Sequence, residues 1–439
     1  MTVRVCSIAL FALLLVAGCT AQIGDAPPSA SQSPPASTLV SATATAPPSL
    51  EFDSIVLLEG EAPGDWAVIG WLRNAAGVGV SNVRIRVAVA DNHGRQLAEL
   101  TTGTLISNFA PGEAGPFLAE FPGVGLAVTA EARVDSFERH FIRRSKLEIE
   151  LLEEFLTEDG DLALLGTVAN PSSQVQSFVS LGLIGVGAAS QPRAVAVLRY
   201  GPRVLGAEET VPFLAVASGN PGQLSWQAYH DAVELEARVP ESLVMDEQPR
   251  VRIDSQGNVF VVGSLRNEAG VPAQARVLIL LWDRDRILSM TEFQTPLSIL
   301  AGERLAFAAQ EFPGLSRRLE QSDPATLRIE SRIQGVAAPE RPIVLRAEVE
   351  AFHSVGSSLF LRGILTNNTL RTADPAAVVA ELRSSDGELL SAGWFITSDP
   401  LAPGERTEFV IDLPLPQGTD PGLVEFDLRA LGSPLKAEQ

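Results

Sequence analysis

The stretch Val262-Gly263-Ser264-Leu265-Arg266-Asn267 carries a short pattern, glycine, any residue, leucine or valine, any residue, asparagine. The same pattern recurs at Gly70–Asn74, Gly166–Asn170 and Gly363–Asn367, and successive glycines are 96, 97 and 100 residues apart. Self-similarity at a nearly constant period is the signature of tandem structural repeats. Because about 95 residues is a common size for a compact all-β domain, the 439-residue chain predicts four such domains.

Each copy of the pattern belongs to a series of short alternating or aliphatic runs, which predict β-strands separated by turns. The strand expected before the pattern is Leu50–Leu58, Leu147–Phe155 or Val344–Phe352 in the copies where it is clearest. The strand expected after it is Val83–Ala90, Ser177–Ile184, Ala275–Trp282 or Ala376–Leu382. A glycine within a strand indicates a bend or a close backbone approach, and an asparagine at its end can close an Asx-turn.

A second turn follows each pattern and precedes a strand with one inward phenylalanine. The turns are Pro111-Gly112-Glu113, Ala301-Gly302-Glu303 and Pro403-Gly404-Glu405, with only the degenerate Gly206-Ala207-Glu208 in the second copy. Proline followed by glycine matches the two central positions of a type II turn. The phenylalanines that we expect to point into the cores are Phe117, Phe213, Phe307 and Phe409.

About seven short strands per repeat predict an immunoglobulin-like sandwich. The pattern, Trp282-Asp283 in the third strand and the turn before phenylalanine together resemble the FxLYD-type bacterial domain over most of residues 50–432. The resemblance implies an extracytoplasmic β-sandwich without catalytic residues. We therefore expect an all-β protein with four tandem immunoglobulin-like sandwich domains in an elongated array. Their expected bounds are 50–139 (repeat 1), 145–240 (repeat 2), 249–335 (repeat 3) and 343–432 (repeat 4), joined by short linkers such as 138–145, 240–249 and 337–342.

The N-terminus has the features of an export signal. A single positive charge, Arg4, precedes the apolar run Cys6–Val16, which is too short to span a bilayer. The run ends in Leu15-Val16-Ala17-Gly18-Cys19, which resembles the lipobox of bacterial lipoproteins. This resemblance implies a signal peptide over 1–18 and transfer of a diacylglyceryl group to the Cys19 thiol; the alternative is an ordinary secretory peptide. Residues 19–49, rich in proline, serine, alanine and threonine, predict an extended, mobile linker.

Charge and cysteine content exclude several classes of protein. The net charge of −20 argues against nucleic acid and against docking on anionic lipid heads, because both need basic patches. The two cysteines, Cys6 and Cys19, both precede the repeats, so each sandwich depends on its apolar core rather than on disulfides.

No pattern of residues predicts catalysis or a bound metal. The four histidines, His93, His140, His230 and His353, are dispersed and lack a partner at ligand spacing, so zinc is not expected. The acidic stretches Glu158–Asp161 and Asp283–Asp285 offer carboxylates to calcium but lie where hairpin turns are expected. Gly182-Leu-Ile-Gly185-Val-Gly187 suggests a phosphate loop only superficially and is better explained by packing of small residues in a strand.

Aromatic and charged residues leave two questions for the structure. Trp71, Trp282 and Trp394 fall within strands, where core packing is the default interpretation. Each repeat ends in an acidic-x-arginine pattern, explained either by solvent exposure or by ion pairs across strands or between domains: Glu131/Arg133, Glu236/Arg238, Glu330/Arg332 and Asp427/Arg429. Repeat 3 has a net charge of +1, whereas repeats 1, 2 and 4 have −6, −7 and −7. Chance variation explains this, and so does a contact through repeat 3.

We therefore predict a non-enzymatic lipoprotein that is anchored at Cys19 to the outer face of a membrane. It would act as a multi-domain binding or presentation module for proteins or other components of the cell envelope. The alternative is a structural spacer or assembly factor with no soluble ligand. No cofactor, metal, nucleic acid or small-molecule substrate is expected.

Overall fold

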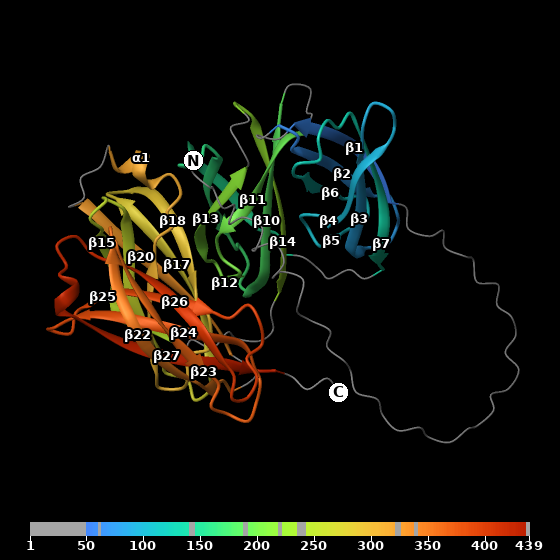
Figure 1. Ribbon diagram of the computed structural model, residues 1–439. Helices are drawn as coiled ribbons and strands as arrows, with labels where there is room; N and C mark the ends of the chain where they lie inside the picture. Colours follow the sequence, from blue (N-terminus) through green and yellow to red (C-terminus); the bar gives the residue numbers. More distant parts are fainter. Residues whose placement is uncertain are drawn as a thin grey trace, which may run out of the picture. The chain divides into compact units, whose positions relative to one another are not determined.

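The computed structural model describes residues 50–59, 63–139, 145–187, 192–217, 222–234, 243–320, 326–337 and 341–435. Cys19, the expected signal peptide, the expected linker 19–49 and His140 lie outside the described residues. Within them the chain is almost entirely β-strand, in antiparallel pairs (Figure 1). The all-β class and the four tandem sandwiches are thus confirmed.

Repeat 1 has two layers. Its strands are β1 (Leu50–Glu59), β2 (Trp66–Asn74), β3 (Val80–Ala90), β4 (Gln96–Gly103), β5 (Asn108–Phe109), β6 (Ala114–Phe121) and β7 (Thr129–Glu138). One layer has the order β1-β2-β6, and in the other β3 lies between β4 and β7 and also pairs with β5. We call these the first and the second sheet of a repeat.

Repeats 3 and 4 follow the same plan. In repeat 3 the strands are β15 (Leu243–Ile253), β16 (Val259–Asn267), β17 (Ala273–Asp283), β18 (Arg286–Gln294), β19 (Arg304–Ala309) and β20 (Leu327–Ala337), with helix α1 (Leu315–Leu319). In repeat 4 they are β21 (Ile343–Val344), β22 (Arg346–Val355), β23 (Ser358–Thr366), β24 (Ala373–Ser384), β25 (Leu389–Ile396), β26 (Arg406–Pro414) and β27 (Val424–Pro434), with the 3₁₀ turn η5 (Pro421–Leu423). The first sheets are β15-β16-β19 and β22-β23-β26, and the second sheets are β18-β17-β20 and β21-β27-β24-β25.

Repeat 2 departs from this plan. Its strands are β8 (Glu148–Leu156), β9 (Leu162–Ala169), β10 (Gln176–Val186), β11 (Pro192–Tyr200), β12 (Val204–Leu205), β13 (Thr210–Ala217) and β14 (Ser225–Glu234). Strand β11 pairs with β10 along its first part and with β13 along its last part, from Ala196 to Tyr200. The two layers of repeat 2 are therefore hydrogen-bonded into one seven-stranded sheet.

Repeat 3 begins earlier than the sequence suggested. Residues 243–249 were expected to belong to a linker, but Leu243 already pairs with Asn267 in the sheet. The proline that suggested a linker, Pro249, lies within β15 at a register shift between Glu247 and Arg250. A proline cannot donate to a ladder, so an irregularity in the strand is where a sheet tolerates it.

Each glycine of the repeated pattern lies beneath the inward phenylalanine of its own sandwich. The cross-strand partners are Gly70 and Phe117, Gly166 and Phe213, Gly263 and Phe307, and Gly363 and Phe409. A Cβ atom on the glycine would lie 2.6, 2.6, 2.9 and 2.6 Å from the ring, respectively. All four rings are at most 1% exposed, which confirms that these phenylalanines point inward. Only glycine leaves room for this close approach.

The asparagine of the pattern joins two turns. In all four copies its side-chain amide donates to the carbonyl four residues later and to a carbonyl at the start of the second turn or just before it. Its Oδ1 accepts from the amide two residues later. For Asn367 these partners are Arg371, Leu401 and Thr369, at 2.8, 2.8 and 3.1 Å. Because every copy is at most 1% exposed, the asparagine satisfies backbone groups that water cannot reach.

The second turn has the expected geometry in three copies. Gly112, Gly302 and Gly404 have φ angles of 79°, 75° and 80°, as the third position of a type II turn requires. In repeat 2 the residue in this place is Glu208, with a φ of 57°, and the following Glu209 donates its amide to Gly206. The turn of repeat 2 is therefore Gly206–Glu209, one residue later than the sequence suggested.

Replacing Asn367 with alanine should lower the free energy of unfolding of repeat 4 by about 2–4 kcal/mol, because four side-chain hydrogen bonds are lost and buried backbone groups are left without partners. The neighbouring Asn368 is exposed, so Asn368→Ala is the matched control. Urea unfolding measures both variants. If both variants lost the same free energy of unfolding, the role assigned to Asn367 would be contradicted.

Replacing Glu208 with glycine should raise the free energy of unfolding by about 0.5–1 kcal/mol, since a left-handed backbone costs a non-glycine residue more than it costs glycine. Thermal unfolding should show a higher midpoint for Glu208→Gly. Glu208→Ala retains Cβ and should not show this gain; a gain of the same size there would contradict the explanation.

Candidate functional site

The described histidines do not gather into a site. His93 lies in the exposed turn after β3, His230 lies in β14, and His353 stacks on Phe360 with 5.6 Å between ring centroids. Among the residues that the structure describes, no group of three or more histidine, cysteine, aspartate or glutamate side chains is placed to hold a metal ion. No helix in this part of the chain is long and apolar enough to cross a bilayer.

One carboxylate from each of the two acidic stretches considered for calcium is hydrogen-bonded to another part of the chain. The Glu158 carboxylate accepts from the backbone amides of Gly314, at 2.7 Å, and Ser316, at 3.1 Å. Asp283 accepts from the Thr326 hydroxyl at 2.6 Å. Because Glu158 belongs to repeat 2 and Gly314 to repeat 3, the first contact points to the surfaces where repeats meet.

Consecutive repeats meet through the outward faces of their sheets. In repeats 1 to 3 the residue just before the pattern glycine points away from its own core: Ile69, Leu165 and Val262. Each of these is buried, in a cluster with side chains of the second sheet of the next repeat. The first sheet of one repeat therefore packs on the second sheet of the next.

Repeats 1 and 2 share an apolar contact with polar bonds around it. Ile69 clusters with Ile184 and Val195, and the Trp71 indole donates to the Tyr229 hydroxyl at 2.9 Å. The Asp231 carboxylate accepts from the Ser107 amide at 3.0 Å and from the Asn108 side chain at 2.9 Å. 

The glycine-rich run of β10 belongs to the same contact. A Cβ on Gly182 would lie 2.8 Å from Leu105 of repeat 1, and one on Gly185 would lie 2.5 Å from Leu224. Packing of small residues in a strand is thus the correct interpretation of this run.

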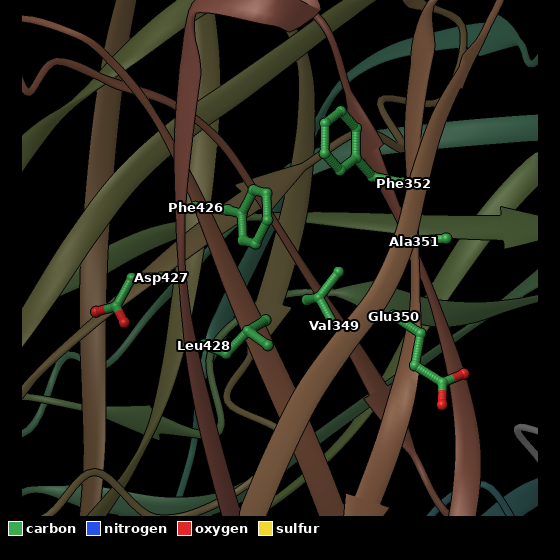
Figure 2. A pocket seen from close by; sticks show the side chains of 7 residues that line it. All are labelled: Val349, Glu350, Ala351, Phe352, Phe426, Asp427 and Leu428. Carbon is green, nitrogen blue, oxygen red and sulfur yellow. The ribbon is translucent and has the colours of Figure 1, made fainter.

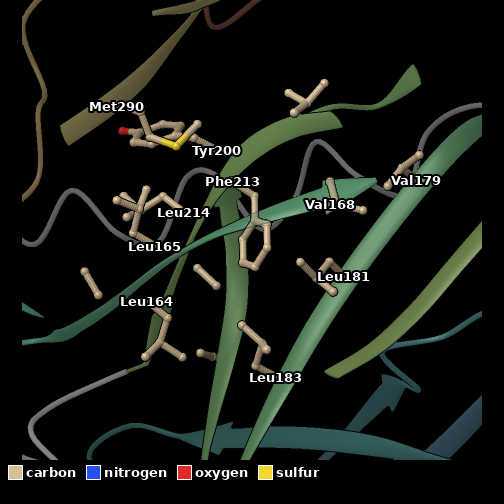
Figure 3. Close-up of a cluster of buried hydrophobic side chains, with 14 of the residues drawn as sticks. Leu164, Leu165, Val168, Val179, Leu181, Leu183, Tyr200, Phe213, Leu214 and Met290 are labelled. Carbon is tan, nitrogen blue, oxygen red and sulfur yellow. The ribbon is translucent and has the colours of Figure 1, made fainter. Parts of the chain in front are cut away.

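Repeats 2 and 3 share one buried cluster. Figure 3 shows Met290 of repeat 3 among the core residues of repeat 2, beside Tyr200. The cluster also takes in Leu278 and Ile287. At its edge Gln334 exchanges hydrogen bonds with the backbone: it accepts from the Arg203 amide at 3.2 Å and donates to the Val204 carbonyl at 2.9 Å.

Glu153 is the ionic centre of this contact. Its carboxylate pairs with Arg286 and, at 2.6 Å, with Arg318, whose side chain is only 7% exposed and lies 4.1 Å from the Phe155 ring centroid. Partial burial acts to raise the pKa of Glu153, but the hydrogen bond from Arg286 and the charge of Arg318 outweigh it, so this pKa lies below its ordinary value.

Repeats 3 and 4 are joined in the same way. Phe260 and Val262 cluster with Leu389 and Ala392. The ion pairs across this contact are Arg250 and Arg252 with Glu388, Arg383 with Glu247, and Arg429 with Glu303. The Glu381 carboxylate, nearly buried, also accepts from the Ala306 amide at 3.2 Å.

Arginines of repeat 3 take part in the contacts with both neighbours. Arg286, Arg318 and Arg332 pair with glutamates of repeat 2, and Arg250 and Arg252 pair with a glutamate of repeat 4. These pairs favour a contact through repeat 3 as the reason for its near-neutral charge. The closing arginines Arg332 and Arg429 contact Glu209 and Glu303, the turn glutamates of the preceding repeats, so between-domain pairing is the correct alternative in repeats 3 and 4.

The three strand tryptophans are not core residues, contrary to expectation. Trp71 is half-buried and bonds to Tyr229, Trp282 packs against the cluster of repeat 2 beneath Arg328, and Trp394 is 39% exposed with its ring against Phe293. All three lie on outward faces, where periodicity alone cannot distinguish a second buried surface from a core.

The two outermost faces of the series are polar. On repeat 1, Arg86 of β3 pairs with Glu99 at 3.4 Å and with Asp135 at 2.6 Å. On repeat 4, Arg362 stands where repeats 1 to 3 have an aliphatic residue, and it pairs with Glu408 at 2.8 Å. Polar outer faces at the ends are what repeat arrays need for solubility.

Repeat 4 carries an open groove that is lined in part by apolar side chains. It lies between β22 and β27, has a volume of about 670 Å³, and is lined by Val349, Glu350, Ala351, Phe352, Phe426, Asp427 and Leu428. Figure 2 shows Val349, Phe426 and Leu428 gathered between the strands, with the carboxylates of Glu350 and Asp427 turned away to either side. Phe352 is 50% exposed and Phe426 is 36% exposed, with 5.8 Å between their ring centroids.

Comparisons with known proteins give no family. No family model matches the chain, and no curated protein matches it. Among solved structures, a tetra-tandem repeat in the extending region of a large adhesion protein aligns at 11% identity and a TM-score of 0.12, over 87% of this chain and 98% of that one. Escherichia coli alpha-2-macroglobulin, activated by porcine elastase, aligns at 12% identity and a TM-score of 0.14, over 88% of this chain and 43% of its own. At these scores neither likeness bears on function.

Replacing Glu153 with glutamine should destabilise the contact between repeats 2 and 3 by about 1–3 kcal/mol, because Arg318 would stay buried without its charge partner. The exposed neighbour Glu154 offers the control Glu154→Gln. Unfolding followed by tryptophan fluorescence measures both.

The same variant has a defined pH dependence. A carboxyl group whose pKa is depressed in the folded state contributes stability above its unfolded value, about 4.3, and loses it as the pH falls through the folded value. The difference in free energy of unfolding between wild type and Glu153→Gln should therefore have its full size at pH 7 and become smaller below about pH 4. A difference that stays constant down to pH 2 would contradict the ion pairs.

Proposed function

We propose that the protein is a non-enzymatic, lipid-anchored extracytoplasmic module that presents its last repeat to a partner in the cell envelope. The anchor is Cys19, acylated within the lipobox-like stretch that ends at this residue. The membrane is then one partner, and a protein of the envelope is the other.

The observation that supports this proposal is the packing of each sandwich on the next. An apolar cluster with hydrogen bonds joins repeats 1 and 2, apolar clusters with ion pairs join the later neighbours, and both end faces are polar. An array joined in this way can hold the last repeat at a defined position relative to the first. Freely jointed domains would not hold it there.

A structural spacer is the second candidate. The same contacts favour it, because a spacer also needs fixed neighbours. The two roles differ in the open groove of repeat 4, which a spacer does not need. Purification of the protein from its membrane, followed by mass spectrometry, separates them: a stoichiometric envelope protein supports presentation, and recovery of the protein alone supports the spacer.

Replacing Cys19 with serine should move the protein from the membrane fraction to the soluble fraction, because a serine hydroxyl is not acylated and one or two acyl chains supply the attachment. Fractionation followed by immunoblotting measures this. Cys6→Ser, which changes the other cysteine, should leave the protein in the membrane. Retention of Cys19→Ser in the membrane fraction would contradict the anchor.

A further inference from the structure

The groove of repeat 4 has closed counterparts in repeats 1 and 3. By strand register, the place of Phe352 is taken by Leu57 in repeat 1 and Val251 in repeat 3, and the place of Phe426 by Ala130 and Ile329. These four aliphatic residues pack against the cores of their own repeats. The two phenylalanines of repeat 4 instead remain exposed, so this end of the sandwich is open.

Two strand edges flank the groove. In the described part of the chain, β22 pairs with β23 alone, and β27 pairs with β24 along its length but with β21 only at Leu431 and Gly432. The edge of β27 that faces away from β24 therefore has no strand partner between Val424 and Arg429 among the described residues. The edge of β22 that faces away from β23 has none either. Unpaired edges beside an apolar surface are what strand addition requires: the main chain supplies hydrogen bonds, and the pockets take alternate side chains.

The charges beside the groove select the occupant. Glu350 and Asp427 line it, and among described residues neither has an ion-pair partner. The same two strands also carry Glu425, and their arginines are already paired, Arg346 with Glu348 and Arg429 with Glu303. A ligand with positive charges on its solvent side would be attracted. A second copy of this chain would not, because each copy has a net charge of −20.

We propose that the groove between β22 and β27 binds an extended basic peptide segment of a partner protein, by strand addition. Its apolar side chains, at alternate positions, lie against Phe352, Phe426, Val349 and Leu428. Its lysine or arginine side chains, on the other face, lie near Glu350 and Asp427. This inference rests on the presentation role proposed above and names the surface that performs it.

A labelled peptide tests the site directly. The probe is acetyl-lysine-valine-arginine-phenylalanine-lysine-valine-arginine-amide, and its acidic twin has glutamate at the four basic positions. Fluorescence anisotropy with the whole chain should show saturable binding of the basic peptide, weakening as salt rises, and at least about tenfold weaker binding of the twin. 

Variants locate the binding. Phe352→Ser with Phe426→Ser should weaken it by about tenfold or more, and Glu350→Gln with Asp427→Asn should weaken it by about threefold or more and flatten the salt dependence. The control Val410→Ser with Asp412→Asn changes an exposed valine and an exposed aspartate on the outward face of β26 and should bind like wild type. All the substituted side chains are exposed, and unchanged circular dichroism would establish that the variants fold.

Three results would overturn the proposal. They are equal binding of the two peptides, unchanged binding by the phenylalanine variant, and self-association of the wild type that the phenylalanine variant abolishes. The last result would show that the groove binds a second copy of this chain. If wild type and the phenylalanine variant recover the same envelope protein from the membrane, the presentation role is supported and peptide binding in the groove is contradicted. If neither recovers one, the presentation role itself fails.

Discussion

A phenyl ring that lies over a glycine is the constraint on which each of the four sandwiches depends. The ring comes from one strand of the first sheet and the glycine from its neighbour, so the pair fixes their register. Two residues beyond the glycine a leucine or valine enters the core, and two further on an asparagine binds both adjoining turns. Strand register, core and turns therefore depend on the same four residues in each repeat. This explains why these positions recur while most others vary.

The positions that vary determine how the sandwiches join. The residue before the glycine is aliphatic in repeats 1 to 3, whose first sheets pack on the next repeat, and is the exposed Arg362 in repeat 4. The arginines of repeat 3 pair with glutamates of both neighbours, and for Arg318, the most buried of them, the pair offsets the cost of burying its charge. The same core plan thus serves interior and terminal repeats. The outward faces distinguish them.

The sequence predicts the repeats, the inward phenylalanines and the strand positions, because these depend on local periodicity and on close contacts within one domain. It does not predict that Trp71, Trp282 and Trp394 lie between repeats, because an outward apolar residue in a strand looks the same whether it meets solvent or a neighbour. The groove was missed for a related reason. Phe352 and Phe426 are 74 residues apart in the chain, and only the register of β22 and β27 relative to the closed repeats reveals their exposure. A position-by-position comparison of the repeats could have singled out these two phenylalanines.

The central claim is that consecutive repeats are fixed to one another, and backbone amides at the contacts report on it directly. The amides of Ser107, Arg203, Ala306 and Gly314 donate to side chains of a neighbouring repeat: Asp231, Gln334, Glu381 and Glu158, respectively. Hydrogen exchange at single-residue resolution in the intact chain measures their protection. The account predicts slow exchange at all four amides, comparable to that of the strands on either side. Exchange at the rate of exposed loop amides would show that the repeats are independent and would contradict the account.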